Sequence, residues 1–294
     1  QAEANRQQNE ADLQRRHEQQ LFAAQDEGAR KALAEEEERK RKFEQDYPRT
    51  EYQKQAMEDH PNRAQVMLCG NAGTSKSTLI NLLMMVVSHL YALARGGSTV
   101  ARVAVSALGE CTERPTVYTF AEDSPLFHLA IMIATPGAGT LLVPEDTYPR
   151  MIGIRYATIV LLVVAERLRA IDHKIYKECL DRRVPVLVVR SKMDNAVENA
   201  IDDAEDEGQE PPTAEQTYEA ARANVISKAA NPPAESGVPS IQIPPERIYL
   251  TSRKYVKEIH DVADFRVRDF YRLFQDISAA VANDVSRDAR RMVA

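Results

Sequence analysis

The chain has 294 residues, and its 38 Lys and Arg against 44 Asp and Glu give a formal net charge of −6. General nucleic-acid binding rests on a basic surface, so this charge argues against a nucleic-acid partner. No apolar run reaches the roughly 18 uncharged residues of a membrane span, and a 44% hydrophobic content is enough for one sizeable domain with an appendage.

Residues 1–46 are rich in Gln, Glu, Arg and Ala, with no proline and a single glycine, which predicts a long solvated helix. Its larger apolar residues give no sustained heptad, so a surface helix is favoured over a dimerising coiled coil. Pro48 is expected to end this helix. We therefore assign residues 1–58 to an N-terminal charged helical segment.

A near-complete phosphate-binding loop occupies residues 70–77, between a predicted buried strand at 65–69 and a predicted buried helix at 77–87. The full pattern is Gly, four free positions, Gly, Lys, then Ser or Thr, and only Ser75 departs from it, where the second glycine belongs. The strand, loop and helix follow in the order that this motif requires.

Such a loop turns backbone N–H groups inward around a phosphate, and the helix adds its positive N-terminal end. Lys76 is expected to reach the β- and γ-phosphates as a catalytic residue, and the Ser77 hydroxyl to bind Mg²⁺. Ser75 takes a position where glycine is usual, so phosphate binding should be weakened but not abolished. The predicted nucleotide contacts of this region are Gly70, Asn71, Ala72, Gly73, Thr74, Ser75, Lys76, Ser77 and Thr78.

Residues 96–109 read as a switch-type loop, followed by predicted strands at 116–120 and 126–133. After the second strand, Ala134-Thr135-Pro136-Gly137 stands in the place of an Asp-x-x-Gly segment. Gly137 keeps the backbone donor on the γ-phosphate side, whereas Ala134 lacks the carboxylate that would hold Mg²⁺. Ala138 has no side chain to orient an attacking water, so hydrolysis must obtain help elsewhere.

An apolar run at 157–164 predicts a central strand, followed by a helix around 171–180 and a parallel-type strand at 184–190. That last strand delivers Ser191-Lys192-Met193-Asp194 to the edge of the sheet where open α/β folds bind ligands. The segment resembles the Asn/Thr-Lys-x-Asp element of GTPases. Asp194 can accept from guanine N1–H and the N2 amino group, which disfavours an ATPase, and Lys192 would lie along the base plane.

Residues 195–245 are acidic and then rich in proline, which predicts a long, partly disordered insertion around one helix at roughly 213–230. A last strand is expected at 247–250 and an amphipathic helix at 267–281. The alternating order predicts an α/β fold with mostly parallel strands and flanking helices. We assign 59–262 to the main domain, including the insertion, and 263–294 to a C-terminal helix.

Four segments in order, at 70–77, 110–118, 136–140 and 189–194, resemble the immunity-related (interferon-inducible) GTPases. The resemblance implies a P-loop NTPase G domain of the dynamin-like kind that binds GTP or GDP, associates with itself through its nucleotide face and works at intracellular membranes. By the same match, Thr112 corresponds to the switch threonine that approaches Mg²⁺ and the γ-phosphate, making it a catalytic and metal-binding position. Ser252 falls in the last base-contacting loop.

Two functions follow from these expectations. In the first, the protein is a slow, assembly-dependent GTPase with Mg²⁺ held by Ser77 and Thr112; in the second, it is a GTP- or GDP-binding scaffold that has lost hydrolysis.

Its three cysteines are too widely spaced for a disulfide framework or a zinc site. We expect a cytoplasmic protein with peripheral contact to intracellular membranes.

Overall fold

The structure is a computed structural model of the chain, which divides into two compact units, Gln1–Arg49 and Thr50–Ala294. It describes residues 49–95, 115–120, 128–138, 148–232, 240–258 and 264–293, together with Glu27, Arg30, Lys31, Ala34, Glu38 and Gly237. The five described residues before Arg49 are helical. The rest of the helix predicted at 1–46, the switch-type loop at 96–109 and Thr112 lie outside the described residues.

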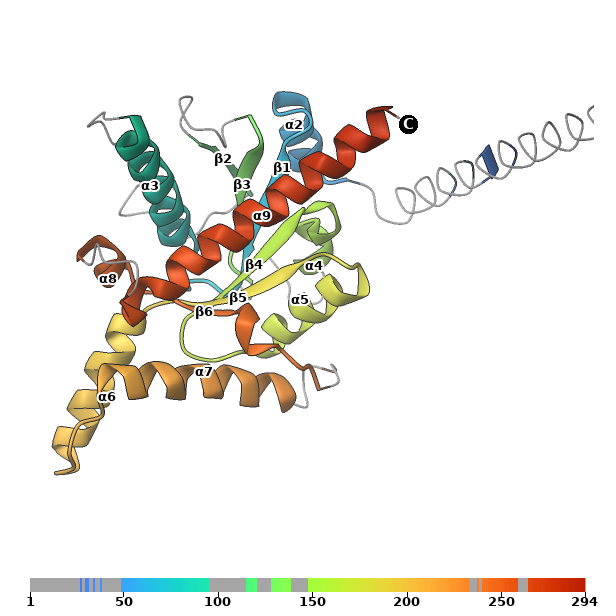
Figure 1. Cartoon of the computed structure of the whole chain (residues 1–294). Coiled ribbons are helices and arrows are strands. Elements are labelled where there is room, and N and C mark those ends of the chain that lie inside the picture. The colour runs from blue at the N-terminus through green and yellow to red at the C-terminus, as the bar shows by residue number, and fades with distance from the viewer. Residues whose placement is uncertain are drawn as a thin grey trace, which may run out of the picture. The chain divides into compact units, whose positions relative to one another are not determined.

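The second unit is built on one six-stranded sheet with the order β2-β3-β1-β4-β5-β6 (Figure 1). All neighbouring strands run parallel except β2 and β3, which are antiparallel. The strands are β1 (Ala64–Cys69), β2 (Thr116–Thr119), β3 (Ala130–Ala134), β4 (Ile159–Val164), β5 (Val186–Arg190) and β6 (Ile248–Leu250). The predicted mixed α/β fold with a mostly parallel sheet is confirmed.

The central strands are apolar at nearly every position because both of their faces are covered. Every residue of β1, β3 and β4 is buried. A strand with two covered faces has no solvent side on which polar residues could alternate, so it reads as a continuous apolar run. This is why the sequence alone locates these three strands, although it places the start of β3 too early.

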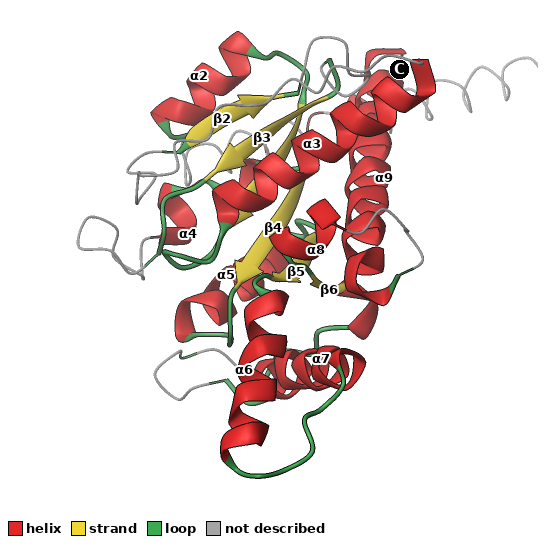
Figure 2. Cartoon of the chain, turned by 90° about the vertical axis from the view of Figure 1, so that its left-hand side faces the viewer, coloured by secondary structure: helices red, strands yellow, loops and turns green. Residues whose placement is uncertain are grey.

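Helices pack on both faces of the sheet (Figures 1 and 2). The apolar side chains of α3 and α9 share one core with the sheet residues facing them. Those of α5 and α7 share a second core on the opposite face, and α2 adds Ala56 against Ile131 and Ile133. The helices of this unit are α2 (Glu51–Asp59), α3 (Lys76–Arg95), α4 (Tyr148–Met151), α5 (Ala170–Asp181), α6 (Met193–Asp206), α7 (Ala214–Ala230), α8 (Arg253–Glu258) and α9 (Phe265–Val293), with 3-10 turns at Ile154–Tyr156 and Pro245–Arg247.

The strand predicted at 126–133 is displaced in the structure. β3 begins only at Ala130 and ends at Ala134, and residues 126–127 lie outside the described residues. His128, which falls within the predicted strand, is an exposed turn residue. The turn sets the start of the strand, since the Leu129 carbonyl accepts the Ala64 N–H at 2.8 Å and aligns β3 with β1.

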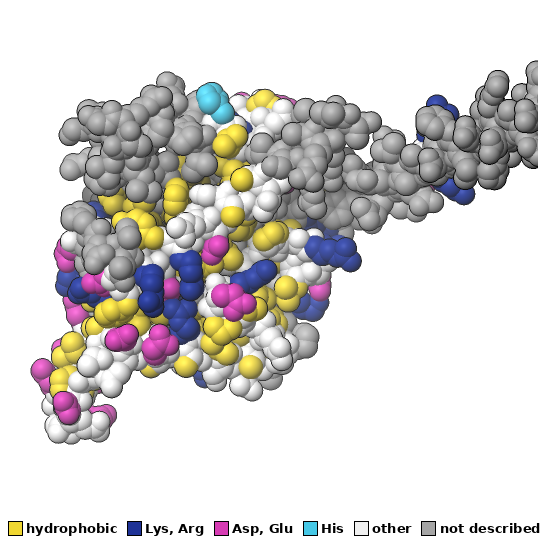
Figure 3. Space-filling model, in the orientation of Figure 1, with side chains coloured by type: hydrophobic (Ala, Val, Ile, Leu, Met, Phe, Trp, Pro, Cys, Tyr) yellow, Lys and Arg dark blue, Asp and Glu magenta, His cyan; other side chains and the backbone are white. Residues whose placement is uncertain are grey.

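The insertion predicted as partly disordered at 195–245 contains two helices. The helix expected at 213–230 is confirmed as α7, but α6 was not predicted, because its acidic composition masks a narrow apolar face. Met193, Val197 and Ala204 of α6 are buried, while its acidic side chains beyond Asp194 are exposed. Acidic side chains gather at the outer end of α6 (Figure 3). In the same view, the central face of the molecule mixes basic and acidic side chains.

Helix α2 was also missed, and it belongs to the same compact unit as the sheet. Gln53 is fully buried and its Nε2 donates to the Gly153 carbonyl at 2.8 Å. The Tyr52 hydroxyl donates to the Ile152 carbonyl. A buried glutamine and a half-buried tyrosine supply these contacts, so α2 lacks the apolar periodicity by which a packed helix is usually recognised.

Candidate nucleotide-binding site

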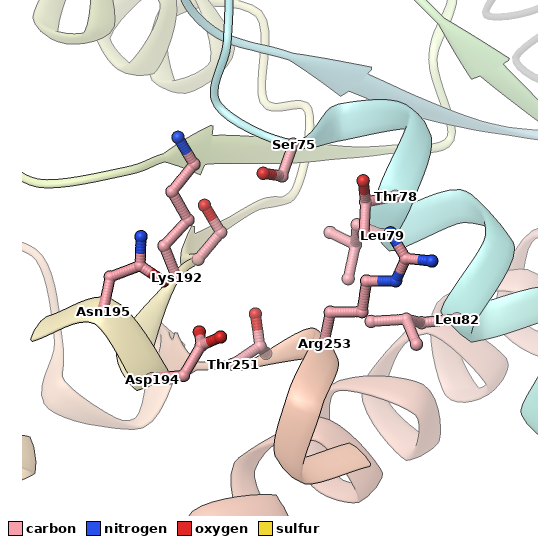
Figure 4. Close-up of a pocket in the computed structure, with 10 residues that line it drawn as sticks. Ser75, Thr78, Leu79, Leu82, Lys192, Asp194, Asn195, Thr251 and Arg253 are labelled. Carbon is pink, nitrogen blue, oxygen red and sulfur yellow. The ribbon is translucent and has the colours of Figure 1, made fainter. Parts of the chain in front are cut away.

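The carboxyl ends of the parallel strands meet at one edge of the sheet, and backbone hydrogen bonds hold the segments that follow them together. The Ser191 N–H donates to the Val164 carbonyl at 2.8 Å, and the Thr251 N–H donates to the Arg190 carbonyl at 2.8 Å. Beside these segments lies a pocket of about 220 Å³ (Figure 4). Its lining residues are Ser75, Thr78, Leu79, Leu82, Ser191, Lys192, Asp194, Asn195, Thr251 and Arg253.

The loop between β1 and α3 has the backbone of a phosphate-binding loop. Gly70 has φ 140°, and a Cβ there would lie 2.2 Å from the Val163 carbonyl oxygen, so only glycine fits. Gly73 has φ 73°, and Ser75 has φ 67° in the left-handed region. Ser75 therefore adopts the conformation for which glycine is usual, at a cost in backbone energy.

Lys76 lies over this loop and is 9% exposed. Its Nζ donates to the carbonyls of Gly70 at 3.0 Å and Asn71 at 2.8 Å. Thr74 closes the same turn, since its Oγ1 donates to the Asn71 carbonyl at 2.9 Å. The Lys76 ammonium is thus held beside the loop at residues 70–77, where it can bind an anion.

The loop is also joined to the strand end after β5. Ser191 is buried, and its Oγ lies 2.9 Å from the Thr74 carbonyl and 3.2 Å from the Val164 carbonyl. The contact with Thr74 connects segments that are 117 residues apart in the chain, and the contact with Val164 spans 27 residues. Residues 191–194 and the phosphate loop therefore keep a fixed spacing across the pocket.

A third support comes from α5, and sequence reasoning missed it. Asp172 is 1% exposed, and its two carboxylate oxygens each lie 3.3 Å from Asn71 Nδ2. The Arg169 backbone N–H donates to the same carboxylate at 2.8 Å. The only sequence signal was an acidic residue in the first turn of a predicted helix, which is expected of any helix start.

The segment after β3 packs directly on the phosphate loop. The Ala138 N–H donates to the Gly70 carbonyl at 3.2 Å, and a Cβ on Gly137 would approach Ala72 Cα at 2.6 Å. Gly137 thus needs to be glycine because another backbone lies against it. Ala134 is fully buried at the end of β3, so the position of the missing carboxylate faces the core.

Tyr148 holds the segment after β3 in place through hydrogen bonds. Its hydroxyl donates to the Pro136 carbonyl at 2.7 Å and lies 2.8 Å from Thr135 Oγ1. Burial raises the pKa of Tyr148, and Cys69 close by adds to the effect. The tyrosine therefore stays protonated and keeps its donor in place.

Lys192 and Asp194 stand on the wall of the pocket across from α3 (Figure 4). Lys192 has φ 59°, and this left-handed backbone conformation turns the chain from β5 into α6. Its side chain is exposed. Asp194 is half-buried in the first turn of α6. Within the described part of the chain, its carboxylate has no hydrogen bond or ion pair, so its oxygens are available as acceptors.

Four of the predicted nucleotide contacts, Ser75, Thr78, Lys192 and Asp194, line the pocket together. Ser252 does not line it: the residue is 1% exposed and its Oγ accepts the Tyr255 N–H at 3.3 Å, capping α8. The neighbouring Thr251 lines the pocket instead. Leu79, Leu82, Asn195 and Arg253 were not predicted as site residues, since nothing in their own segments distinguishes them from core or surface residues.

Within the described ranges, no three His, Cys, Asp or Glu residues lie close enough together to hold a metal ion. Ser77 lies half-buried in the first turn of α3, where a loop-bound phosphate would bring Mg²⁺ to its hydroxyl. Ala134 supplies no ligand, and Thr112 lies outside the described residues. Nor does any helix in the described part of the chain have the length and apolarity to cross a bilayer.

The strand order, the loop between β1 and α3 and the position of Lys192 and Asp194 after β5 define the class of fold. The unit is a P-loop α/β domain with the architecture of a GTPase G domain.

Comparisons with known proteins are sparse at the level of sequence. No protein-family model matches the chain, and no curated protein is significantly similar to it. Among solved structures, a "probable GTP-binding protein engB" is 12% identical over 76% of this chain and 100% of its own, with a TM-score of 0.38. A likeness at this level carries no functional information.

Proposed function

We propose that this protein binds a guanine nucleotide, with the base in the pocket beside Asp194 and the phosphates along residues 70–77. The observation that carries the proposal is the pocket itself, which is lined both by Ser75 and Thr78 and by Lys192 and Asp194. A volume of about 220 Å³ is below the roughly 300–1,000 Å³ of whole-ligand sites. The pocket suits one part of a nucleotide, while the phosphates extend over the loop.

The choice of base rests on Asp194. Its carboxylate is half-buried at the pocket wall and is free of hydrogen bonds within the described ranges. Two oxygens at this place can accept from both guanine N1–H and the N2 amino group, a donor pair that adenine does not present. A site that places hydrogen-bonding groups against one ligand rejects the analogue that leaves them unpaired.

For catalysis we propose a slow GTPase. Lys76 supports slow turnover, because its ammonium lies at the loop and would stabilise charge on the phosphates, and Ser77 supplies a hydroxyl for Mg²⁺. The second candidate, a nucleotide-binding scaffold without hydrolysis, is favoured by Ala134 and Ala138. Position 134 has no carboxylate to hold Mg²⁺, and position 138 has no side chain to orient an attacking water.

The resemblance to immunity-related GTPases motivates three further proposals. We propose that self-association through the nucleotide face raises the low turnover, that the protein is cytoplasmic, and that it contacts intracellular membranes peripherally. Phosphate release measured over a range of protein concentrations tests the first of these, and co-sedimentation with lipid vesicles tests the last. Turnover per molecule that is independent of concentration would count against assembly.

The proposed function is tested by calorimetric titration of the protein with GDP and ADP. We expect GDP to bind at least tenfold more tightly, since each unpaired polar contact costs on the order of 1–3 kcal/mol. Chromatography of the nucleotide released by denaturing gently purified protein provides a second measurement, in which guanine nucleotide should predominate. Equal affinity for GDP and ADP would contradict the proposal.

A further inference from the structure

A second pocket, of about 810 Å³, lies at the edge of the sheet opposite the candidate nucleotide site. Its lining includes Ile159, Pro185 and Arg247, which stand where β4, β5 and β6 begin. The nucleotide site lies at the carboxyl ends of these strands, and the six residues of β4 span about 20 Å. A volume of this size falls within the roughly 300–1,000 Å³ of whole-ligand sites. The proposed binding of a guanine nucleotide makes no use of this pocket.

Helix α9 forms one side of the pocket, where it crosses β4, β5 and β6 (Figure 1). Two hydrogen bonds hold this stretch of α9 to the sheet. The Tyr249 hydroxyl donates to the Asp276 carboxylate. Thr158 Oγ1 donates to the Asp284 carboxylate at 2.8 Å. The pocket-lining residues of α9 between these contacts include the alanines 279–280, which have no atoms beyond Cβ to fill the space under the helix.

The floor of the pocket is apolar. Ile159, Leu187 and Tyr249 line it, and all three are buried in the core that α9 shares with the sheet. The Arg272 guanidinium carbon lies 4.7 Å from the centre of the Tyr249 ring, and its Nη2 donates to the Ile248 carbonyl at 2.9 Å. Arg272 is therefore occupied by protein groups, and the floor suits the apolar or aromatic body of a ligand.

Two arginines of the pocket have no hydrogen-bond or ion-pair partner for their guanidinium groups within the described ranges. These are Arg183 and Arg247, and both are exposed. Their backbones are fixed by turns, since the Arg183 N–H donates to the Leu180 carbonyl at 3.0 Å. The Arg247 N–H donates to the Pro244 carbonyl at 2.9 Å. Guanidinium groups bind carboxylates and phosphates through paired, charge-assisted hydrogen bonds, so this side of the pocket suits an anion.

The opposite charge comes mainly from α9. Asp276 and Asp284 each accept a hydrogen bond from the sheet, and a carboxylate with two oxygens has further acceptor positions. Glu246, next to Arg247, adds a third carboxylate. These three carboxylates balance the three lining arginines, so the pocket is formally neutral. An anion alone would leave the α9 carboxylates without a partner, whereas a ligand with charges of both signs satisfies both sides.

We propose that this pocket binds a small zwitterion. Its anionic group, a carboxylate or a phosphate, lies between Arg183 and Arg247, and its apolar or aromatic body covers the floor. Asp276 and Asp284 stand about 12 Å apart along the α9 axis, so one ammonium group meets only one of them. The ammonium pairs with Asp276, which is the more exposed of the two. The inference does not depend on the proposed nucleotide, because no residue lines both pockets.

The test is a titration with tyramine phosphate, followed by NMR of the protein amides. This probe joins a phosphate, an aromatic ring and an ammonium group, and phenyl phosphate and phenethylamine are its two single-charge halves. We expect tyramine phosphate to bind at least about tenfold more tightly than either half, since each end makes a charge-assisted contact.

Two variants separate the two ends of the probe. Arg247→Ala should weaken tyramine phosphate and phenyl phosphate about tenfold without weakening phenethylamine. Asp276→Asn keeps an acceptor for the Tyr249 hydroxyl, and it should weaken tyramine phosphate and phenethylamine without weakening phenyl phosphate.

Arg268→Ala is the matched control, because Arg268 is an exposed arginine of α9 that does not line the pocket. It should leave all three affinities unchanged. Binding of tyramine phosphate no tighter than that of phenyl phosphate would overturn the inference, since the carboxylate side would then play no part. Loss of binding in Lys76→Ala would place the probe on residues 70–77 and overturn the inference too, as would unchanged binding in Arg247→Ala.

Discussion

The Ser191 hydroxyl lies 2.9 Å from the Thr74 carbonyl and so joins the base side of the candidate site to its phosphate side. We expect Ser191→Ala to lower the free energy of unfolding by about 1 kcal/mol, because the buried Thr74 carbonyl loses its donor. GDP affinity should fall several-fold as the two sides lose their fixed spacing. Chemical denaturation and calorimetry measure the two effects, and Ser191→Thr, which keeps the hydroxyl, should preserve both.

Lys76→Ala should weaken nucleotide binding by on the order of 2–3 kcal/mol, since it removes a charge-assisted contact to the phosphates. Calorimetry with GDP measures the loss. Lys254→Ala serves as the control, as Lys254 lies on α8 with Glu198 as its partner. An unchanged GDP affinity in Lys76→Ala would mean that residues 70–77 do not bind phosphate.

Asp194→Asn should change the preferred base. The new amide can donate to the C2 carbonyl of xanthine but no longer accepts from the guanine amino group, so affinity should fall for GDP and rise for xanthosine diphosphate. Calorimetric titration of the unmodified protein and of Asp194→Asn with GDP and with xanthosine diphosphate measures this change in preference. If the two nucleotides bind Asp194→Asn as they bind the unmodified protein, Asp194 does not contact the base.

Ser75→Gly should stabilise the protein. Ser75 has φ 67°, a conformation that costs a side-chain-bearing residue roughly 1–2 kcal/mol, while glycine gives back about 0.5–1 kcal/mol through the greater entropy of the unfolded chain. The net gain should be about 0.5–1 kcal/mol, seen as a higher denaturation midpoint at unchanged slope, together with tighter GDP binding. Arg183→Gly, at φ 56° and outside the pocket, should gain stability without a change in affinity.

Ala134→Asp separates the slow GTPase from the scaffold. Position 134 is fully buried, so a carboxylate there should destabilise the metal-free protein and make GTP binding depend more strongly on Mg²⁺. Thermal denaturation and GTP titration with and without Mg²⁺ measure these two changes. Brisk, Mg²⁺-dependent phosphate release by the unmodified protein at low concentration would instead refute the scaffold.

The elements that the sequence predicted best are those whose burial is uniform. β1 and β4 are apolar on both faces, and the loop pattern at 70–77 includes a glycine whose need is local, Gly73, which has φ 73° and no neighbouring atom that would exclude a side chain. Helix α6 was missed because only three of its fourteen residues are buried.

The site was predictable in part for the same reason. Residues 70–77 and 191–194 carry recognisable patterns, whereas Arg253 lines the pocket only because α8 starts directly after β6. The role of Asp172 depends on the packing of α5 against the phosphate loop, a relationship across about a hundred residues of chain that no local pattern encodes.

The contact between Asn71 and Asp172 has a consequence for the thermodynamics of binding. Together with the Ser191 and Lys76 contacts, it sets the shape of the phosphate loop through protein groups alone. A loop that is already ordered does not lose conformational entropy when a ligand arrives, so more of the interaction free energy is expressed as affinity. Asn71→Ala should therefore make the entropy of GDP binding less favourable and speed hydrogen exchange of the loop amides, even though Asn71 is held from the side of the loop that faces α5.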